Sequence, residues 1–109
     1  MLVKTDPGFP YTLAAKIELQ GEFFVLVDPD WLDYLIQFNW YAKKSNSQYY
    51  ACRKVTDGKS VWFIRMHRLI ADTPVDLVCH HVNRKTLDNR RANLQNMSWF
   101  EHAKYYSYR

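Results

Sequence analysis

The segment from residue 78 to residue 102 constrains the fold more than any other part of the chain. Residues 78–82 and 94–97 are short β-prone runs, and a polar, basic loop separates them. Ser98 and Glu101 then form a capping box, in which the hydroxyl accepts from the amide three residues on and the carboxylate reaches back to the serine amide. The sequence therefore predicts a strand, a loop, a second strand and a helix that begins directly after Ser98.

Three histidines and one asparagine are spaced through this segment: His80, His81, Asn93 and His102. Neutral imidazole is both a common ligand for divalent metals and a usable general base near pH 7, so adjacent histidines can divide these two tasks. His102 falls in the first turn of the predicted helix, from which it projects toward the strand pair. The segment is therefore a candidate metal centre.

This order of histidine pair, central asparagine and helical histidine resembles the motif of the HNH (ββα-metal) endonucleases. Residues 66–70 (MHRLI) and 87–94 (LDNRRANL) are similar to the phage- and intron-borne branch of that family. The resemblance is dense from about Tyr49 to His102. It implies an α+β fold, in which N-terminal antiparallel strands with a short helix precede a C-terminal ββα-metal nuclease unit.

The resemblance also implies residue roles in hydrolysis of a DNA phosphodiester. His81 is the expected general base, and an ordinary histidine pKa near 6.5 suits that work. His80 and His102 are the expected ligands of one divalent cation, Mg²⁺ or Mn²⁺ first and Zn²⁺ or Ni²⁺ as alternatives. Only two protein ligands are expected, because Tyr106 stands where some relatives, the nuclease colicins among them, carry another histidine. Asn93 is expected to hydrogen-bond across the loop and fix the backbone that presents His81.

Several structural interpretations compete with these roles. His81 could be a hydrogen-bonded surface histidine, and the catalytic role requires its ring to face solvent and substrate. A closed zinc site that recruits Cys79 is disfavoured, since neighbouring strand residues point to opposite faces. His67, at a predicted helix start, suits packing or capping. Asn89 suits a turn that tolerates a left-handed backbone, with Asp88 capping local amides.

The charge is distributed unevenly. Residues 1–42 hold two Lys and six Asp/Glu, a net −4, whereas residues 43–109 hold thirteen Lys/Arg and five Asp/Glu, a net +8. A basic half that also carries the histidines favours a polyanionic partner, and DNA is the partner that the resemblance implies. The expected phosphate contacts are Arg84, Lys85, Arg90 and Arg91, with Arg68 as a further candidate that could instead form a structural ion pair. A solvated loop is the alternative for any one of them.

Two rival functions stay open at this point. One is a catalytically silent HNH-like protein that binds DNA or a partner protein, and the other is a nuclease that acts on RNA. A second copy of the chain, in a homodimer, or a phage protein is a further possible partner, and either would add contacts to DNA that so short a chain lacks.

The 109 residues predict a single small domain in three parts: an irregular arm over 1–14, a sheet-plus-helix scaffold or DNA-binding region over 15–65, and the nuclease unit over 66–109. Pro7, Gly8 and Pro10 favour the irregular arm. A hairpin is expected with its turn near Gly21, and Asp28 is expected to cap a short helix.

Composition completes the expectations. The aromatics Trp31, Trp40, Trp62, Phe63 and Trp99 are assigned to the core. No apolar run is long enough to cross a bilayer, and the first residues lack the apolar stretch of a secretory signal. Cys52 and Cys79 are far apart and form no CxxC pair, which favours free thiols. A cytoplasmic protein without membrane contact is therefore expected, in a phage-infected host cell if the resemblance holds.

Overall fold

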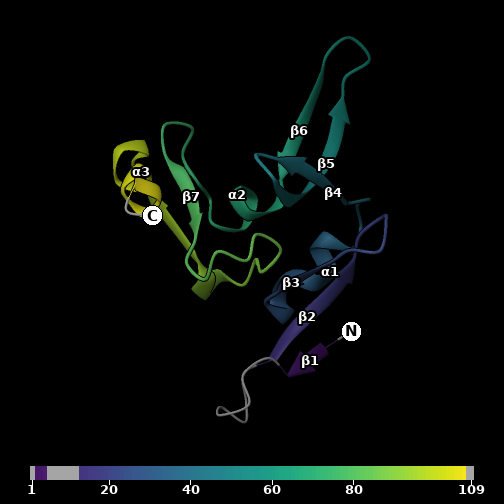
Figure 1. Cartoon of the computed structure of the whole chain (residues 1–109). Coiled ribbons are helices and arrows are strands. Elements are labelled where there is room, and N and C mark those ends of the chain that lie inside the picture. The colour runs from purple at the N-terminus through teal and green to yellow at the C-terminus, as the bar shows by residue number, and fades with distance from the viewer. Residues whose placement is uncertain (1, 5–12, 108–109) are drawn as a thin grey trace.

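The computed structural model describes residues 2–4 and 13–107. The fold is α+β, as predicted, with antiparallel strands in three small sheets and few helices (Figure 1). The first sheet has the order β1-β2-β3, the second β4-β5-β6, and β7 pairs with β8. The strands are β1 (Leu2–Lys4), β2 (Leu13–Glu18), β3 (Phe24–Val27), β4 (Tyr41–Ser45), β5 (Gln48–Thr56), β6 (Val61–Arg65), β7 (Val78–His81) and β8 (Leu94–Met97).

The helices are short, apart from the last. They are η1 (Pro29–Trp31), which continues into α1 (Leu32–Leu35), then α2 (Met66–Ile70), η2 (Arg91–Asn93) and α3 (Trp99–Ser107). Within the described residues, no helix combines the length and the apolar character that crossing a membrane requires.

The irregular arm predicted over residues 1–14 is wrong where the structure describes it. Residues 2–4 form β1, which pairs with β2 through Leu2 opposite Ala15 and Lys4 opposite Leu13. The alternating residues before the first proline are free to extend, because a proline restricts its immediate neighbourhood only. Residues 5–12, with Pro7, Gly8 and Pro10, lie outside the described part of the chain.

The next two predicted features are a hairpin and a helix start. The β2–β3 hairpin is confirmed, and its turn has positive φ at Gly21 (+87°) and Glu22 (+71°). Asp28 precedes η1 in an extended conformation, but its side chain does not cap the helix. Its carboxylate instead accepts a hydrogen bond from the amide of Arg91 at 2.6 Å. The side-chain cap predicted for Asp28 is therefore wrong, because a distant amide occupies that carboxylate.

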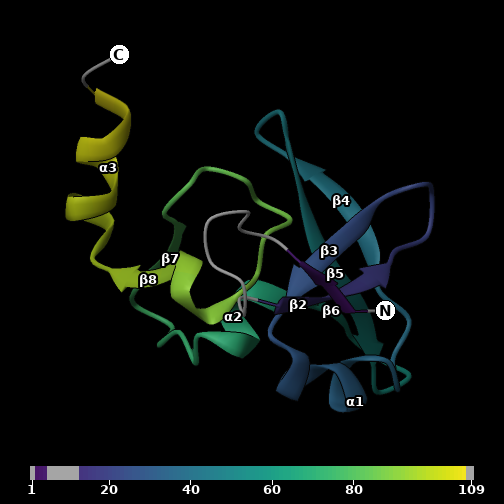
Figure 2. The same ribbon diagram turned by 90° about the horizontal axis from the view of Figure 1, so that it is seen from below.

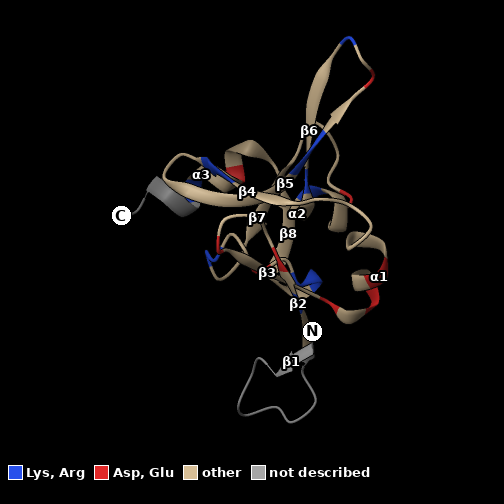
Figure 3. Ribbon diagram, turned by 90° about the vertical axis from the view of Figure 1, so that its right-hand side faces the viewer, with Lys and Arg blue, Asp and Glu red and all other residues tan. Residues whose placement is uncertain are grey.

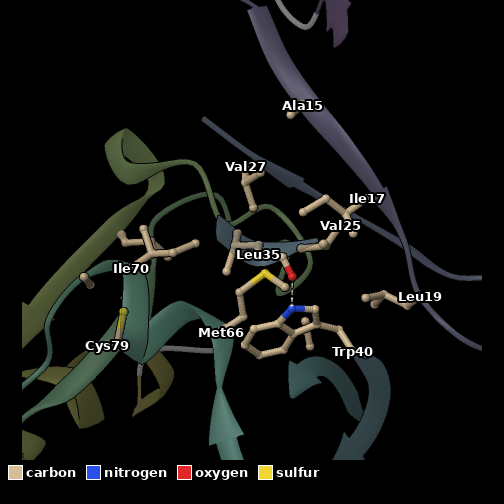
Figure 4. Packing of buried hydrophobic residues seen from close by; sticks show 13 residues of the cluster. Ala15, Ile17, Leu19, Val25, Val27, Leu35, Trp40, Met66, Ile70 and Cys79 are labelled. Carbon is tan, nitrogen blue, oxygen red and sulfur yellow. Dashed lines mark hydrogen bonds between the residues drawn. The ribbon is translucent and has the colours of Figure 1, made fainter. Parts of the chain in front are cut away.

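The core joins the N-terminal sheet to the β7–β8 pair. Leu35 and Met66 are fully buried at its centre, and the indole of Trp40 donates to the carbonyl of Leu35 at 2.8 Å (Figure 4). Cys79 on β7 and Leu94 on β8 belong to the same buried cluster. The strands that carry the histidine segment are thus held by apolar burial against the first half of the chain.

The assignment of aromatics to the core is only partly right. Trp40 is buried, but Trp62 on β6 is 45% exposed, Phe63 39% and Trp99 on α3 70%. These side chains are on the protruding β5–β6 hairpin and on α3, where no second layer covers them (Figure 1). Composition predicted apolar burial there, but the small core has no room for them.

The loop between β7 and β8 docks on the outer edge of β3. The amide of Leu26 donates to the carbonyl of Leu87 at 2.9 Å, and the amide of Asn89 donates to the carbonyl of Leu26 at 2.7 Å. Figures 1 and 2 both show this loop beside β3. The N-terminal sheet therefore fixes the loop that the histidine segment encloses.

Candidate functional site

His80 and His102 come together from two elements. His80 is on β7 and His102 lies in the first turn of α3, and their ring centroids are 5.3 Å apart with the planes at 71°. The helix start is set by the predicted capping box, which is confirmed: Glu101 N donates to Ser98 Oγ at 3.0 Å, and Ser98 N donates to the Glu101 carboxylate at 3.2 Å. Local sequence thus places His102 against the end of the strand.

This pair has the geometry and the protonation state that a shared cation needs. Two imidazoles bound to one ion at N–metal distances of about 2.1 Å have centroids roughly 5 Å apart. Burial lowers the pKa of His80, with a further contribution from the charge of His102, and burial also lowers the pKa of His102. Both rings therefore favour the neutral form that can ligate a metal.

The described residues offer no larger ligand set. No three His, Cys, Asp or Glu side chains among them gather in a metal-binding arrangement. Cys79 and Cys52 are free thiols, as expected, and the Cys79 Sγ donates to the carbonyl of His67 at 3.7 Å. The side chain of Tyr106 lies outside the described part of the chain. A cation at this position would therefore take two ligands from the described residues.

His81 differs from the expectation of a solvent-facing ring. Its exposed fraction is 5%, its Nε2 is 2.8 Å from Asn89 Oδ1, and its ring centroid is 4.9 Å from that of His67 and 6.0 Å from that of Tyr50. The ring nevertheless forms part of the wall of a cavity of about 190 Å³. His81 is thus largely buried, and it borders this cavity.

The cavity brings together residues from β4, β5, β6, α2, β7 and α3 and from the loop after β7. His102 lines it as well as His81, together with Tyr50, Arg65, His67, Arg68 and Arg84. The pKa of His81 is lowered, and burial is the largest cause. The hydrogen bond with Asn89 and the charge of Asp88 raise this pKa, but they do not outweigh burial. His67 is also buried, and its pKa is lowered to about 3, first by burial and then by the charge of His81. Both rings are neutral at pH 7 and can accept a proton.

Asn93 bridges the loop. Its Oδ1 accepts from the amide of Asn83 at 2.9 Å, and its Nδ2 donates to the carbonyl of Asp88 at 2.8 Å. Its own carbonyl accepts from the amide of Val82, next to His81, at 2.8 Å. These hydrogen bonds have the geometry that the resemblance implies for fixing the backbone beside His81.

The loop is closed internally by an ion pair. Arg90 holds Asp88 with two guanidinium nitrogens, at 2.8 Å and 2.7 Å, and Asn83 Nδ2 adds a third hydrogen bond at 2.8 Å. Burial alone would raise the pKa of Asp88, but the hydrogen bonds from Arg90 and Asn83 outweigh it and lower the pKa. Asp88 is thus a charged anchor within the loop, and the charge of Arg90 is largely neutralised there.

The five basic residues predicted to contact phosphate have different surroundings. Arg84 and Lys85 are exposed at the loop tip, and Arg84 adopts a left-handed backbone with φ of +63°. Arg91 is also exposed. Arg68 donates to the carbonyls of Leu77 at 2.9 Å and Pro74 at 2.8 Å, so its guanidinium fixes the segment before β7. Among the five, Arg84 and Lys85 are best placed to meet a ligand.

Sequence reasoning missed a basic, aromatic face of the β4–β6 sheet. Strand register places Lys43 opposite Tyr50, and Lys54 opposite Phe63, on one side of this sheet. The Lys43 ammonium lies 3.7 Å above the centre of the Phe63 ring. None of the residues in these three strands is acidic, and Figure 3 shows red segments around α1 and blue segments along the β5–β6 hairpin. Because Tyr50 also lines the cavity, this face leads into it.

Comparisons with protein-family models, with curated proteins and with solved structures find no match for this chain. The functional assignment therefore depends on the residues and their geometry. The central relationship is that His102 contacts His80 on one side and lines the same cavity as His81 on the other.

Proposed function

We propose that this chain is a metal-dependent DNA endonuclease of the HNH (ββα-metal) type. The observation that supports this most strongly is the position of His102. Its ring is 5.3 Å from that of His80, and it also lines the cavity whose wall includes His81. One pair of imidazoles is thus suited to a cation, and His81, which lines the same cavity as His102, is the proposed base.

The proposed reaction is hydrolysis of a phosphodiester by an in-line water. His81 takes a proton from that water, and Asn93 holds the loop backbone that orients His81. His80 and His102 would hold one divalent cation, which would supply positive charge to a non-bridging phosphate oxygen and to the leaving 3′ oxygen. The expected products carry a 5′-phosphate and a 3′-hydroxyl.

The DNA backbone is proposed to follow basic residues on both sides of the cavity. Arg84 and Lys85 lie on the loop side, and Lys43 and Lys54 lie on the β4–β6 face. Two exposed cations and an aromatic face are suited to a sugar–phosphate backbone. The acidic surroundings of α1 are poorly suited to it. Within the 15–65 region, β4–β6 is therefore the proposed DNA-binding part, and the first sheet is the scaffold.

The test is nicking of supercoiled plasmid by the full chain. Mg²⁺, Mn²⁺, Zn²⁺ and Ni²⁺ are compared with a chelator control, and DNA and RNA substrates are run in parallel. Cleavage that requires a divalent cation supports the proposal. RNA cleavage without DNA cleavage would transfer the function to RNA.

The matched variant is His81→Ala. Loss of cleavage is expected, with gel-shift affinity for DNA and metal uptake retained, because the side chain of His81 contacts Asn89, Tyr50 and His67, and the hydrogen bond from Arg84 goes to its main-chain carbonyl. Equal loss of all three properties would identify a structural histidine instead.

A second candidate is a DNA-binding protein that does not cut. The observation that favours it is the 5% exposure of His81, together with its packing against Tyr50 and His67. Wild-type protein that binds plasmid with each metal yet leaves it supercoiled would establish this alternative.

A further inference from the structure

We propose that Asn89 is a positioning residue that fixes the tautomer of His81, with the proton on Nε2 and the lone pair on Nδ1. The contact behind this is the 2.8 Å separation of His81 Nε2 and Asn89 Oδ1. Asn89 has no exposed surface, so water does not compete for this oxygen. The structural part of the proposal is independent of any reaction, and its catalytic consequence rests on the proposed function.

The chemistry of the two groups determines the proton position. A carboxamide oxygen accepts hydrogen bonds and cannot donate them, so the facing ring nitrogen must carry the hydrogen. A neutral imidazole carries one N–H, which leaves the other nitrogen as the acceptor. For His81, the nitrogen that can take a proton from water is therefore Nδ1.

The backbone of Asn89 is held from both sides. Its amide donates to the carbonyl of Leu26 on β3 at 2.7 Å, and the carbonyl of its neighbour Asp88 accepts from Asn93 Nδ2 at 2.8 Å. Arg90, which follows Asn89 in the chain, donates two hydrogen bonds to the Asp88 carboxylate. These contacts connect the edge of the N-terminal sheet to the ring of His81 through one side chain.

A turn role does not account for Asn89. Its backbone is not left-handed; in this loop that conformation occurs at Arg84. Burying a polar side-chain atom costs about 1–3 kcal/mol unless it is hydrogen-bonded, and the contact with His81 offsets this cost for Asn89 Oδ1, whereas Nδ2 is buried without a partner among the described residues. The interpretation of Asn89 as a left-handed turn residue is therefore wrong, and its side chain has a specific partner.

The primary experiment is ¹⁵N NMR of the histidine rings at pH 8 in the metal-free full chain. The wild-type His81 ring is expected to show the Nε2–H pattern. Asn89→Asp retains an accepting oxygen and should preserve the pattern, whereas the isosteric Asn89→Leu should give a mixture of tautomers. A wild-type ring protonated on Nδ1, or an unchanged pattern in folded Asn89→Leu, would overturn the assignment. If Asn89→Leu does not fold, the assignment is tested by the other two proteins: the His81 ring should carry its proton on Nε2 in the wild type and in Asn89→Asp, and a proton on Nδ1 in the wild type would overturn it.

The kinetic experiment uses the same variants on plasmid DNA. Asn89→Leu should lower kcat by about 10- to 100-fold with little change in KM, and Asn89→Asp should recover part of that loss. A merely structural residue would lower the stability of both variants without this rescue. If the wild-type protein cuts DNA but lacks the Nε2–H tautomer, the role of Asn89 is refuted and the nuclease proposal is not. If it has the tautomer but does not cut DNA, the nuclease proposal is refuted and the structural role of Asn89 is not.

Discussion

The carboxylate of Asp28 accepts a hydrogen bond from the backbone amide of Arg91, 63 positions later in the chain, at 2.6 Å. Asp28 directly follows β3, and Arg91 begins the last turn of the loop before β8. Together with the two main-chain hydrogen bonds of Leu26, this contact fixes both ends of the segment 87–91 to the first sheet. The candidate site is thus built on a scaffold outside its own strands.

Asp28→Ala tests that anchor. Loss of a hydrogen bond to a charged acceptor should lower the free energy of unfolding by about 1–2 kcal/mol in urea titrations. The amide of Arg91 should also exchange faster with solvent. Asp30→Ala removes the same charge two residues away, at an exposed position. Equal effects of the two variants would mean that charge, and not the contact with Arg91, matters.

His102→Ala tests the proposed cation pair. Removing one of the two imidazoles should abolish saturable Mn²⁺ or Zn²⁺ uptake in calorimetric titrations. His67→Phe is the control, since it also removes a histidine but one that lies outside the pair. Uptake that survives in His102→Ala and is lost in His67→Phe would relocate the metal to the cavity.

His67 should make the protein sensitive to mild acid. Its folded pKa of about 3 lies below the ordinary value of 6.5, so between these pH values the unfolded chain binds more protons than the folded one. Stability is therefore complete above pH 6.5 and falls as the pH drops, by roughly 2 kcal/mol at pH 5 from this group alone. Urea midpoints measured from pH 7.5 to 5 should decline less in His67→Phe. Identical slopes in both proteins would contradict this.

Arg84 allows backbone and charge effects to be separated. The backbone of Arg84 has a φ of +63°, which glycine adopts without a steric cost. The free energy of unfolding of Arg84→Gly should therefore be about 1 kcal/mol higher than that of Arg84→Ala. Both variants lose the cation and should bind DNA equally weakly. A difference in DNA affinity between them would show that loop geometry, and not charge, governs binding.

Lys43 and Lys44 are neighbours on β4 with side chains on opposite faces of the sheet. If the face with Lys43 meets DNA, Lys43→Ala should reduce the slope of log affinity against log salt by about 0.9. Lys44→Ala should leave the slope unchanged. The reverse result would assign DNA binding to the other face.

Local signals in the sequence predicted much of the fold. The capping box at Ser98 and Glu101 set the start of α3, and the turn near Gly21 located the β2–β3 hairpin, because these structures depend on neighbouring residues. The approach of His102 to His80 was anticipated from the same local signals and the family resemblance.

The remainder depends on contacts that spacing does not reveal. Pairing of β1 with β2, the Asp28–Arg91 contact and the Asn89–His81 contact all join residues whose local preferences favour other structures. Asn89 has the composition of a turn residue, and only the docking of the loop on β3 turns its side chain inward. The burial of His81 has the same origin, since Tyr50 and His67 come from other elements. The roles of these residues in a reaction stay predictions.

The docking of residues 87–89 on β3 also has a consequence for solubility. β3 is the outermost strand of its sheet, and an uncovered strand edge recruits other chains into intermolecular pairing. The loop occupies both the amide and the carbonyl of Leu26 on that edge. Substitutions that detach the loop would therefore uncover a template for self-association, and such variants are expected to aggregate.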